Sequence, residues 1–242
     1  MTDTLFSPEV YDLAKRVIDE NKAIGRRVTV AESCTGGLVS GALTEVPGSS
    51  AVFQCGFTTY ADAEKMRPLL EVANRHNAVV FIHFGPRPGD DWPRVPKGTD
   101  NMRRRMGTLD MQANLSANMV TLCMTDILDG YPDAMIQSHN LGGNIPYEVE
   151  RMDHRCLIDT PDEELPSIRF AKSPVYVDCN SLGARAIEAG VQTYGEDRIV
   201  FGTDGSAFGC NWTTKALNEA RISDEARQKI LHHNAANMLS HL

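Results

Sequence analysis

Helical segments and short apolar runs alternate from residue 66 to the end of the chain, and this alternation constrains the fold more than any other feature of the sequence. The apolar runs are residues 78–83 (AVVFIH), 134–139 (AMIQSH), 175–179 (VYVDC) and 198–204 (RIVFGTD), with helical patterns between them. Continuously apolar strands are typical of parallel sheets that are covered on both faces. Strand–helix alternation then requires right-handed crossovers, either in a doubly wound sheet or in a (β/α) barrel. The sequence therefore predicts an α/β fold with a mostly parallel sheet and flanking helices.

The first 67 residues carry helix and strand signals of their own. Ser7 is placed to cap a helix, and Pro8 suits its first turn. The predicted elements are a helix over residues 7–23, a strand over 27–32, a turn over 33–37, a helix from residue 38, a strand over 51–60 and a helix over 62–74. We expect these strands to cover one open edge of the main sheet, which would then have about six strands.

Polar side chains stand at the ends of three of the later strands. His83, His139 and Asp204 each close an apolar run. In parallel α/β folds, ligands and catalysis collect at the carboxyl edge of the sheet. Two imidazoles and a carboxylate suit a divalent metal, with a histidine or carboxylate left to move protons. A hydrogen-bonded structural histidine is the alternative role for each imidazole taken singly, but three such residues on one sheet favour a shared site.

Residues 68–242 resemble the C-terminal half of the amidohydrolase-2 family, which includes aminocarboxymuconate-semialdehyde decarboxylase. The matching segments are residues 79–83 (VVFIH), 138–143 (SHNLGG), 146–147 (PY), 150–155 (ERMDHR), 197–204 (DRIVFGTD), 222–225 (ISDE) and 234–236 (NAA). The resemblance implies a TIM barrel, of which this region would form only part. It also implies that His83 is a metal ligand, that His139 is the catalytic histidine, and that Asp204 binds metal or moves a proton.

The chain departs from that family in its metal ligands. The family carries an H-x-H pair on its first strand, whereas none of the seven histidines here forms H-x-H or lies before residue 76. The ligand set is therefore reduced to His83 and Asp204, with His139 beside them. We expect a divalent metal, zinc by its donor set, to bind weakly because water must replace the lost ligands.

Residues 7–67 resemble a different family, the CinA C-terminal family of nicotinamide-nucleotide amidases. The matching segments are residues 31–40 (AESCTGGLVS), 43–50 (LTEVPGSS), 59–60 (TY) and Lys65. The resemblance implies that Ser33 is a nucleophile with Lys65 as its base and Tyr60 assisting, and a serine does need such a base. Capping of the following helix is the alternative role for Ser33. The family's Thr-Gly-x-Ala-Gly-Pro-type loop has no counterpart in this chain.

Composition argues against nucleic-acid and membrane partners. The net charge of −8 disfavours non-specific nucleic-acid binding. No apolar run approaches the roughly 20 residues that a membrane span needs, and the N-terminus lacks the pattern of a signal peptide. The six cysteines form no C-x-x-C motif, which indicates reduced thiols. We expect a cytoplasmic protein that acts on a small molecule, and a homo-oligomer, because part of a barrel leaves open strand edges.

The sequence thus reads as two incomplete domains, residues 1–67 and 68–242, joined as in a fusion or a recombined or designed chimera. The favoured function is that of a metal-dependent hydrolase or decarboxylase of the amidohydrolase superfamily, acting on a small organic acid or amide. A nicotinamide-nucleotide amidase with a Ser/Lys pair is the alternative. A catalytically inactive chimera or binding scaffold is the second alternative.

Overall fold

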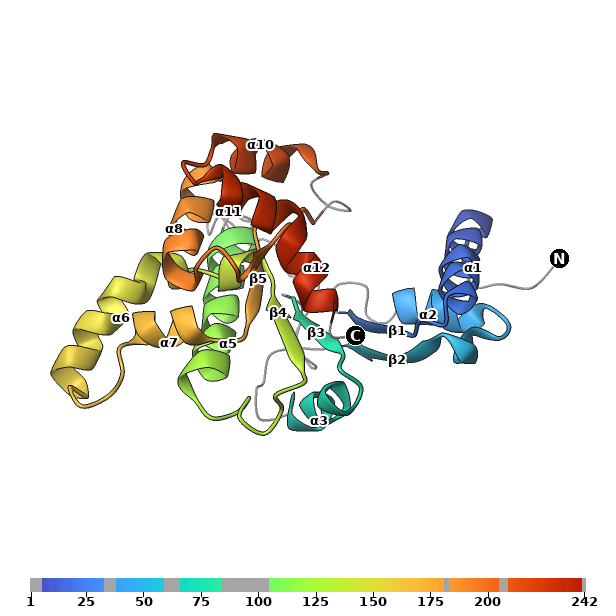
Figure 1. The fold of residues 1–242 in the computed structure, drawn as a ribbon, viewed down its shortest axis with the longest axis horizontal. Coiled ribbons are helices and arrows are strands. Elements are labelled where there is room, and N and C mark those ends of the chain that lie inside the picture. The colour runs from blue at the N-terminus through green and yellow to red at the C-terminus, as the bar shows by residue number, and fades with distance from the viewer. Residues whose placement is uncertain are drawn as a thin grey trace, which may run out of the picture. The chain divides into compact units, whose positions relative to one another are not determined.

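The computed structural model describes residues 6–32, 38–58, 66–83, 105–180, 183–204 and 209–240. The chain divides into two compact units, Met1–Tyr60 and Ala61–Leu242, and each is described by itself. Within the described ranges, no helix combines the length and the apolar character that crossing a membrane requires. Helices and strands carry the labels used in Figure 1.

The first unit is a small α/β layer built on two parallel strands. Its elements are α1 (Pro8–Ala23), β1 (Val28–Glu32), α2 (Leu38–Glu45) and β2 (Phe53–Thr58). Helix α1 begins where the sequence predicts, because the Ser7 hydroxyl accepts a hydrogen bond from the Val10 amide at 3.4 Å. Strand β1 pairs with β2 in parallel, from Val28 opposite Phe53 to Glu32 opposite Thr58.

Helix α1 presents more apolar surface than the first unit covers. Of its apolar face, Ala14 and Ile18 are buried, whereas Val10, Leu13 and Val17 are 39–58% exposed. The buried pair packs in a small core with Ala42, Leu43, Val46 and Val52. The rest of the helix's apolar stripe therefore faces outward from the described part of this unit.

The second unit is a parallel sheet with helices packed against it. Its elements are α3 (Arg67–Arg75), β3 (Val79–Ile82), a π-helical turn (Arg105–Asp110), α5 (Met111–Met124), β4 (Met135–Ser138), α6 (Ile145–Asp159), α7 (Pro166–Lys172), β5 (Tyr176–Asp178), α8 (Ala184–Tyr194), β6 (Ile199–Val200), α10 (Asn211–Glu219), α11 (Asp224–Gln228), a second π-helical turn (Lys229–His233) and α12 (Asn234–Leu239). The strands lie in chain order, β3-β4-β5-β6, and every pair is parallel. The predicted α/β class, with a partial barrel-like C-terminal region, is confirmed.

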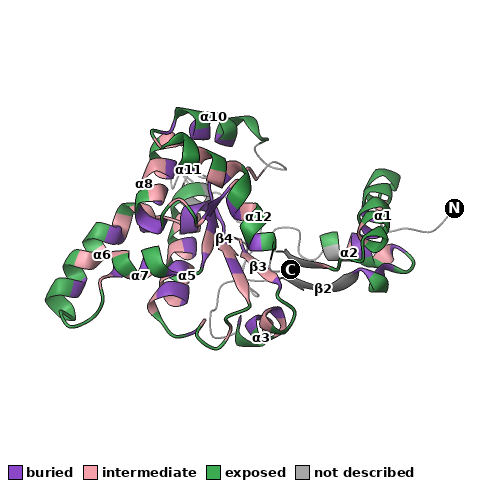
Figure 2. Ribbon diagram, in the orientation of Figure 1, coloured by how far each residue is buried: buried purple, intermediate pink, exposed green. Residues whose placement is uncertain are grey.

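One face of this sheet forms the main core. On β3, Val80 and Ile82 are buried while their neighbours are only partly covered, and β4 alternates in the same way. The buried face meets side chains from α3, α5, α6, α7 and α8 in one continuous cluster. Figure 2 shows the buried residues concentrated along these strands and on the helix faces turned toward them. The opposite face, which would line the interior of a barrel, is therefore the more open one.

Several elements differ from the sequence prediction. Among the described residues, β1 and β2 form a separate two-stranded sheet instead of extending the main one. The predicted strand over residues 198–204 pairs only at Ile199–Val200, because the chain then leaves the ladder and brings Asp204 to the sheet edge. The sequence pattern does not predict helices α7 and α10. The final helix, predicted as one element, contains the π-helical turn Lys229–His233.

Candidate metal centre

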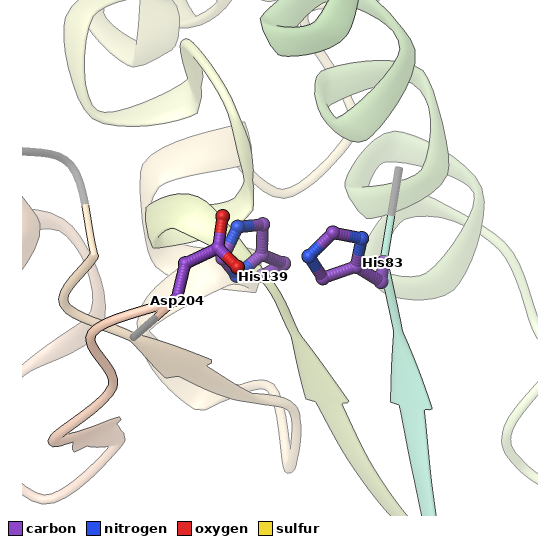
Figure 3. Close-up of side chains that lie close together, drawn as sticks. All are labelled: His83, His139 and Asp204. Carbon is purple, nitrogen blue, oxygen red and sulfur yellow. The ribbon is translucent and has the colours of Figure 1, made fainter. Parts of the chain in front are cut away.

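Three sequence-predicted residues converge at the carboxyl edge of the main sheet. His83 follows β3, His139 follows β4, and Asp204 lies four residues beyond the end of β6. Because all four strands are parallel, their carboxyl ends meet at one edge. Figure 3 shows the three side chains turned toward one another at this edge. One potential ligand atom from each of the three lies within 4.8 Å of the other two.

The two imidazoles are in direct ring contact. The ring centroids of His83 and His139 are 4.1 Å apart and their planes differ by 23°. Phe81, which shares the open face of β3 with His83, meets both rings edge-on at 5.8 and 6.0 Å. His139 is 3% exposed, while His83 and Asp204 are partly exposed. The cluster thus has a buried wall at His139 and an accessible side.

His139 is held by a buried carboxylate that sequence reasoning missed. Its Nδ1 lies 2.9 Å from Oδ2 of Asp178, which is 2% exposed. The other carboxylate oxygen, Oδ1, accepts hydrogen bonds from the backbone amides of Asn140 at 3.0 Å and Asn180 at 3.1 Å. The signal for Asp178 was available, since it stands near the end of the apolar run at residues 175–179. The sequence does not show that Asp178 contacts His139, because 39 residues separate the two.

The turn after His139 is conformationally strained. Asn140 and Leu141 have φ values of 58° and 52°, and Gly142 and Gly143 continue with 67° and 81°. Left-handed backbone costs a branched residue such as Leu141 on the order of 1–3 kcal/mol. The Asn140 amide bonded to Asp178 holds one end of this turn. A Cβ at Gly143 would stand 2.3 Å from a main-chain oxygen of α5, so that position requires glycine.

The donor set fits a divalent metal ion. Two imidazoles and one carboxylate match the three protein ligands that catalytic zinc sites use, with a further position open. Atoms bound to one zinc ion lie at most about 4.2 Å apart, twice a Zn–N bond of about 2.1 Å. The three candidate ligand atoms lie within 4.8 Å of one another, so only a small movement of the side chains would bring them to that spacing. Two of these side chains are partly exposed.

The structure does not describe the three residues of the alternative serine site. Ser33, Tyr60 and Lys65 lie outside the described residues. Their mutual geometry therefore stays a prediction. The flanking elements β1, α2 and β2 have the predicted order of strand, helix and strand.

Comparison by sequence finds relatives of the N-terminal segment. Residues 10–78 match the model of the CinA C-terminal domain family, which is less than a third of the chain. The nicotinamide-nucleotide amidohydrolase PncC of Pseudomonas putida is 49% identical over 60 residues, which are 25% of this chain and 38% of that protein. The chain spans less than half the length of this and the next curated relatives that it matches.

Comparison by structure finds a second set of similar proteins. The 2,6-dihydroxybenzoate decarboxylase from Rhizobium aligns with a TM-score of 0.57 and 17% identity, over 98% of this chain and 82% of that one. A dihydroxybenzoic acid decarboxylase from Polaromonas, solved with bound manganese and an inhibitor, aligns with a TM-score of 0.55 and 16% identity, over 97% and 80% of the two chains. At these identities the likeness shows the fold. The predicted resemblances are thus confirmed, one by sequence and the other by fold.

Proposed function

We propose that the second unit is a divalent-metal-dependent hydrolase or decarboxylase that acts on a small organic acid or amide. The observation that carries this proposal is the convergence of His83, His139 and Asp204 at the carboxyl edge of a parallel sheet. That edge is where α/β enzymes place their chemistry. The manganese in the structurally similar Polaromonas decarboxylase supports the proposal of a divalent ion.

Each residue of the cluster has a distinct proposed role. His83 and Asp204 would hold the ion, which, when bound, would polarise a carboxylate or carbonyl oxygen of the substrate. His139 is suited to move a proton at Nε2, because Asp178 occupies its Nδ1 and would stabilise the charged imidazolium. Decarboxylation exchanges a carboxylate on carbon for a proton, and amide hydrolysis delivers a proton to the leaving amine. Both reactions need such a proton carrier.

The donor atoms favour zinc, and the ligand count predicts weak binding. The test is calorimetric titration of metal-stripped protein with Zn²⁺ and with Mn²⁺. We expect His83→Ala and Asp204→Ala each to abolish measurable binding, because each change removes one of the two residues that would hold the ion. His154→Ala, which removes an exposed imidazole on α6, is the matched control and should bind like the parent chain. Equal binding by all four proteins would refute the site.

Activity is tested on the same variants. We would first assay release of carbon dioxide from dihydroxybenzoates with added metal, since these are the substrates named for the structurally similar enzymes. Loss of turnover in His139→Gln, measured at metal concentrations that saturate the variant, would support its role as proton carrier. Metal binding without turnover of any acid or amide would favour the inactive-scaffold alternative. We propose a small-molecule target, because a net charge of −8 disfavours binding to nucleic acids. The reduced cysteines predicted from the absence of a C-x-x-C motif fit a cytoplasmic location.

The family match over residues 10–78 supports a second candidate, a nicotinamide-nucleotide amidase. Ser33 would be the nucleophile, Lys65 its base and Tyr60 an assisting group. The test is ammonia release from a nicotinamide nucleotide. Loss of activity in both Ser33→Ala and Lys65→Ala, with Ser240→Ala as a control at an exposed serine outside the matching segments, would establish it. Because this chain spans only 38% of the first relative, we expect little or no turnover.

We also infer that the chain self-associates. The outward-facing Val10, Leu13 and Val17 form an apolar stripe on α1. Burying such surface between two copies gains roughly 25 cal/mol per Å². Size exclusion with light scattering should therefore show species larger than 26.6 kDa, and Leu13→Glu should shift them toward monomer. A monomer at all micromolar concentrations would contradict this inference.

A further inference from the structure

The two oxygens of the Asp178 carboxylate have different hydrogen-bond partners. Oδ1 accepts two backbone amides, from Asn140 and Asn180. Oδ2 lies 2.9 Å from Nδ1 of His139. Oδ1 alone accepts the hydrogen bonds of both backbone amides. The contact of Oδ2 with the imidazole is therefore not needed to pair these amides.

The side chain of Asn140 acts on the other nitrogen of the same ring. Its Oδ1 accepts a hydrogen bond from the side-chain amide of Gln112 at 2.9 Å, which orients the Asn140 NH₂ group away from Gln112. That NH₂ group lies 3.5 Å from Nε2 of His139. An acceptor thus faces Nδ1 and a donor faces Nε2, and only one neutral tautomer satisfies both.

From this pair of contacts we propose that Asp178 is a positioning residue that holds His139 in the Nδ1–H tautomer and so leaves Nε2 with a lone pair instead of a proton. The lone pair is what a metal ligand or a general base requires. A carboxylate on the far nitrogen of an imidazole is the usual way to fix ring orientation and raise basicity. The tautomer assignment rests on the hydrogen bonds alone. Its role in metal binding rests on the proposed function.

Packing around the carboxylate supports the same assignment. A Cβ at Gly202 would stand 2.7 Å from the Asp178 Cβ and 3.0 Å from its Cγ. Residue 202 must therefore be glycine if the Asp178 side chain is to keep its position, because any Cβ there would displace it.

The substitution Asp178→Asn separates the two roles. The amides of Asn140 and Asn180 still need an acceptor, so the asparagine must place its Oδ1 where the aspartate Oδ1 was. Its NH₂ group then faces Nδ1 of His139 and demands a lone pair there. The proton must move to Nε2, which then becomes a donor that can no longer ligate a metal or accept a proton.

The experiment reads the tautomer directly in metal-free protein. Long-range ¹H–¹⁵N spectra of the ¹⁵N-histidine-labelled chain distinguish Nδ1–H from Nε2–H, and His139→Gln assigns the signal. We expect the Nδ1–H pattern in the parent chain and the Nε2–H pattern in Asp178→Asn. Asp153→Asn is the matched control, because Asp153 also accepts a backbone amide, that of Ser167, and it should leave His139 unchanged.

Either of two results would overturn the proposal. One is an Nε2–H pattern in the parent chain, which is readable even if Asp178→Asn fails to fold. The other is an unchanged tautomer in a folded Asp178→Asn protein. Zn²⁺ titration forms a separate arm, in which Asp178→Asn should weaken binding about 10–100-fold. A parent chain with the Nδ1–H pattern and no affinity for Zn²⁺ would remove the metal function and leave the positioning role standing.

Discussion

Gly202→Ala is the sharpest test of how the site edge is packed. The added Cβ would meet the Cβ of Asp178 at 2.7 Å, whereas ordinary van der Waals contacts begin at 3.4 Å. A Cβ cannot move by side-chain rotation, so the main chains at residues 178 and 202 would have to separate by about 0.7 Å, the difference between those two distances. The backbone at Gly202 has no positive φ that would penalise alanine by itself.

The magnitude follows from what that separation disturbs. Overpacking a well-filled core costs about 1–3 kcal/mol. The Cys179 amide donates to the Val200 carbonyl at 3.0 Å, directly between β5 and β6. An opening of about 0.7 Å at this point would carry that bond beyond 3.5 Å, the limit for a useful hydrogen bond. We therefore expect the free energy of unfolding to fall by about 1–3 kcal/mol, together with faster amide hydrogen exchange at Cys179.

The assay is urea unfolding followed by tryptophan fluorescence. Trp92 and Trp212 are the only two tryptophans in the sequence, and both belong to the unit Ala61–Leu242. Gly130→Ala is the control, since a Cβ there meets nothing within 4 Å, and it should be neutral or stabilise by up to about 1 kcal/mol. A Gly202→Ala protein within about 0.5 kcal/mol of the parent, the usual range of surface changes, would refute the packing argument.

Three further predictions concern single side chains of the second unit. Burial raises the pKa of the Cys179 thiol to about 12, so iodoacetamide at pH 8 should modify exposed Cys210 and spare Cys179 in the native protein, as peptide mass spectrometry can show. The buried Ser138 hydroxyl has no hydrogen-bond partner within the described part of the chain, so Ser138→Ala should leave the urea midpoint unchanged or raise it. The buried Asn234 side chain donates to two main-chain carbonyls at 2.7 Å each, so Asn234→Ala should lower the free energy of unfolding by about 1–3 kcal/mol, and an unaltered midpoint would contradict this.

Local signals explain which elements could be predicted from the sequence. The start of α1 is set by Ser7 and Pro8, which act within one turn, so its observed bounds match the prediction closely. Helix α7 has only seven residues and buries just Pro166 and Phe170, too few for a helical period to stand out. The exposure of Leu13 could not be foreseen either, because a periodic pattern gives the apolar face of a helix and not how much of that face is covered.

The site shows the same division between local and tertiary information. His83, His139 and Asp204 could be grouped because parallel strands put their ends at one edge, which is a rule of topology. Asp178 could not be assigned to His139, since its role depends on the pairing of β4 with β5. The early end of β6 at Val200 could not be foreseen either, because the apolar run continues to Phe201 without a local signal that ends the strand.

The distribution of backbone strain bears on whether this edge serves chemistry or merely ends a sheet. Among the described residues, the non-glycine positions with positive φ are Asn77, Asn140, Leu141 and Asp204. The last three lie at the cluster edge, and two of them adjoin or carry a proposed functional group. Each such conformation costs on the order of 1–3 kcal/mol and persists only where the surroundings enforce it. Here the enforcing contacts include the Asn140 amide on the Asp178 carboxylate and the Tyr194 hydroxyl on the Leu141 carbonyl at 2.9 Å. A scaffold with no chemistry at this edge would gain stability by relaxing the turn, so strain held by buried hydrogen bonds beside His139 favours an active site over the scaffold alternative.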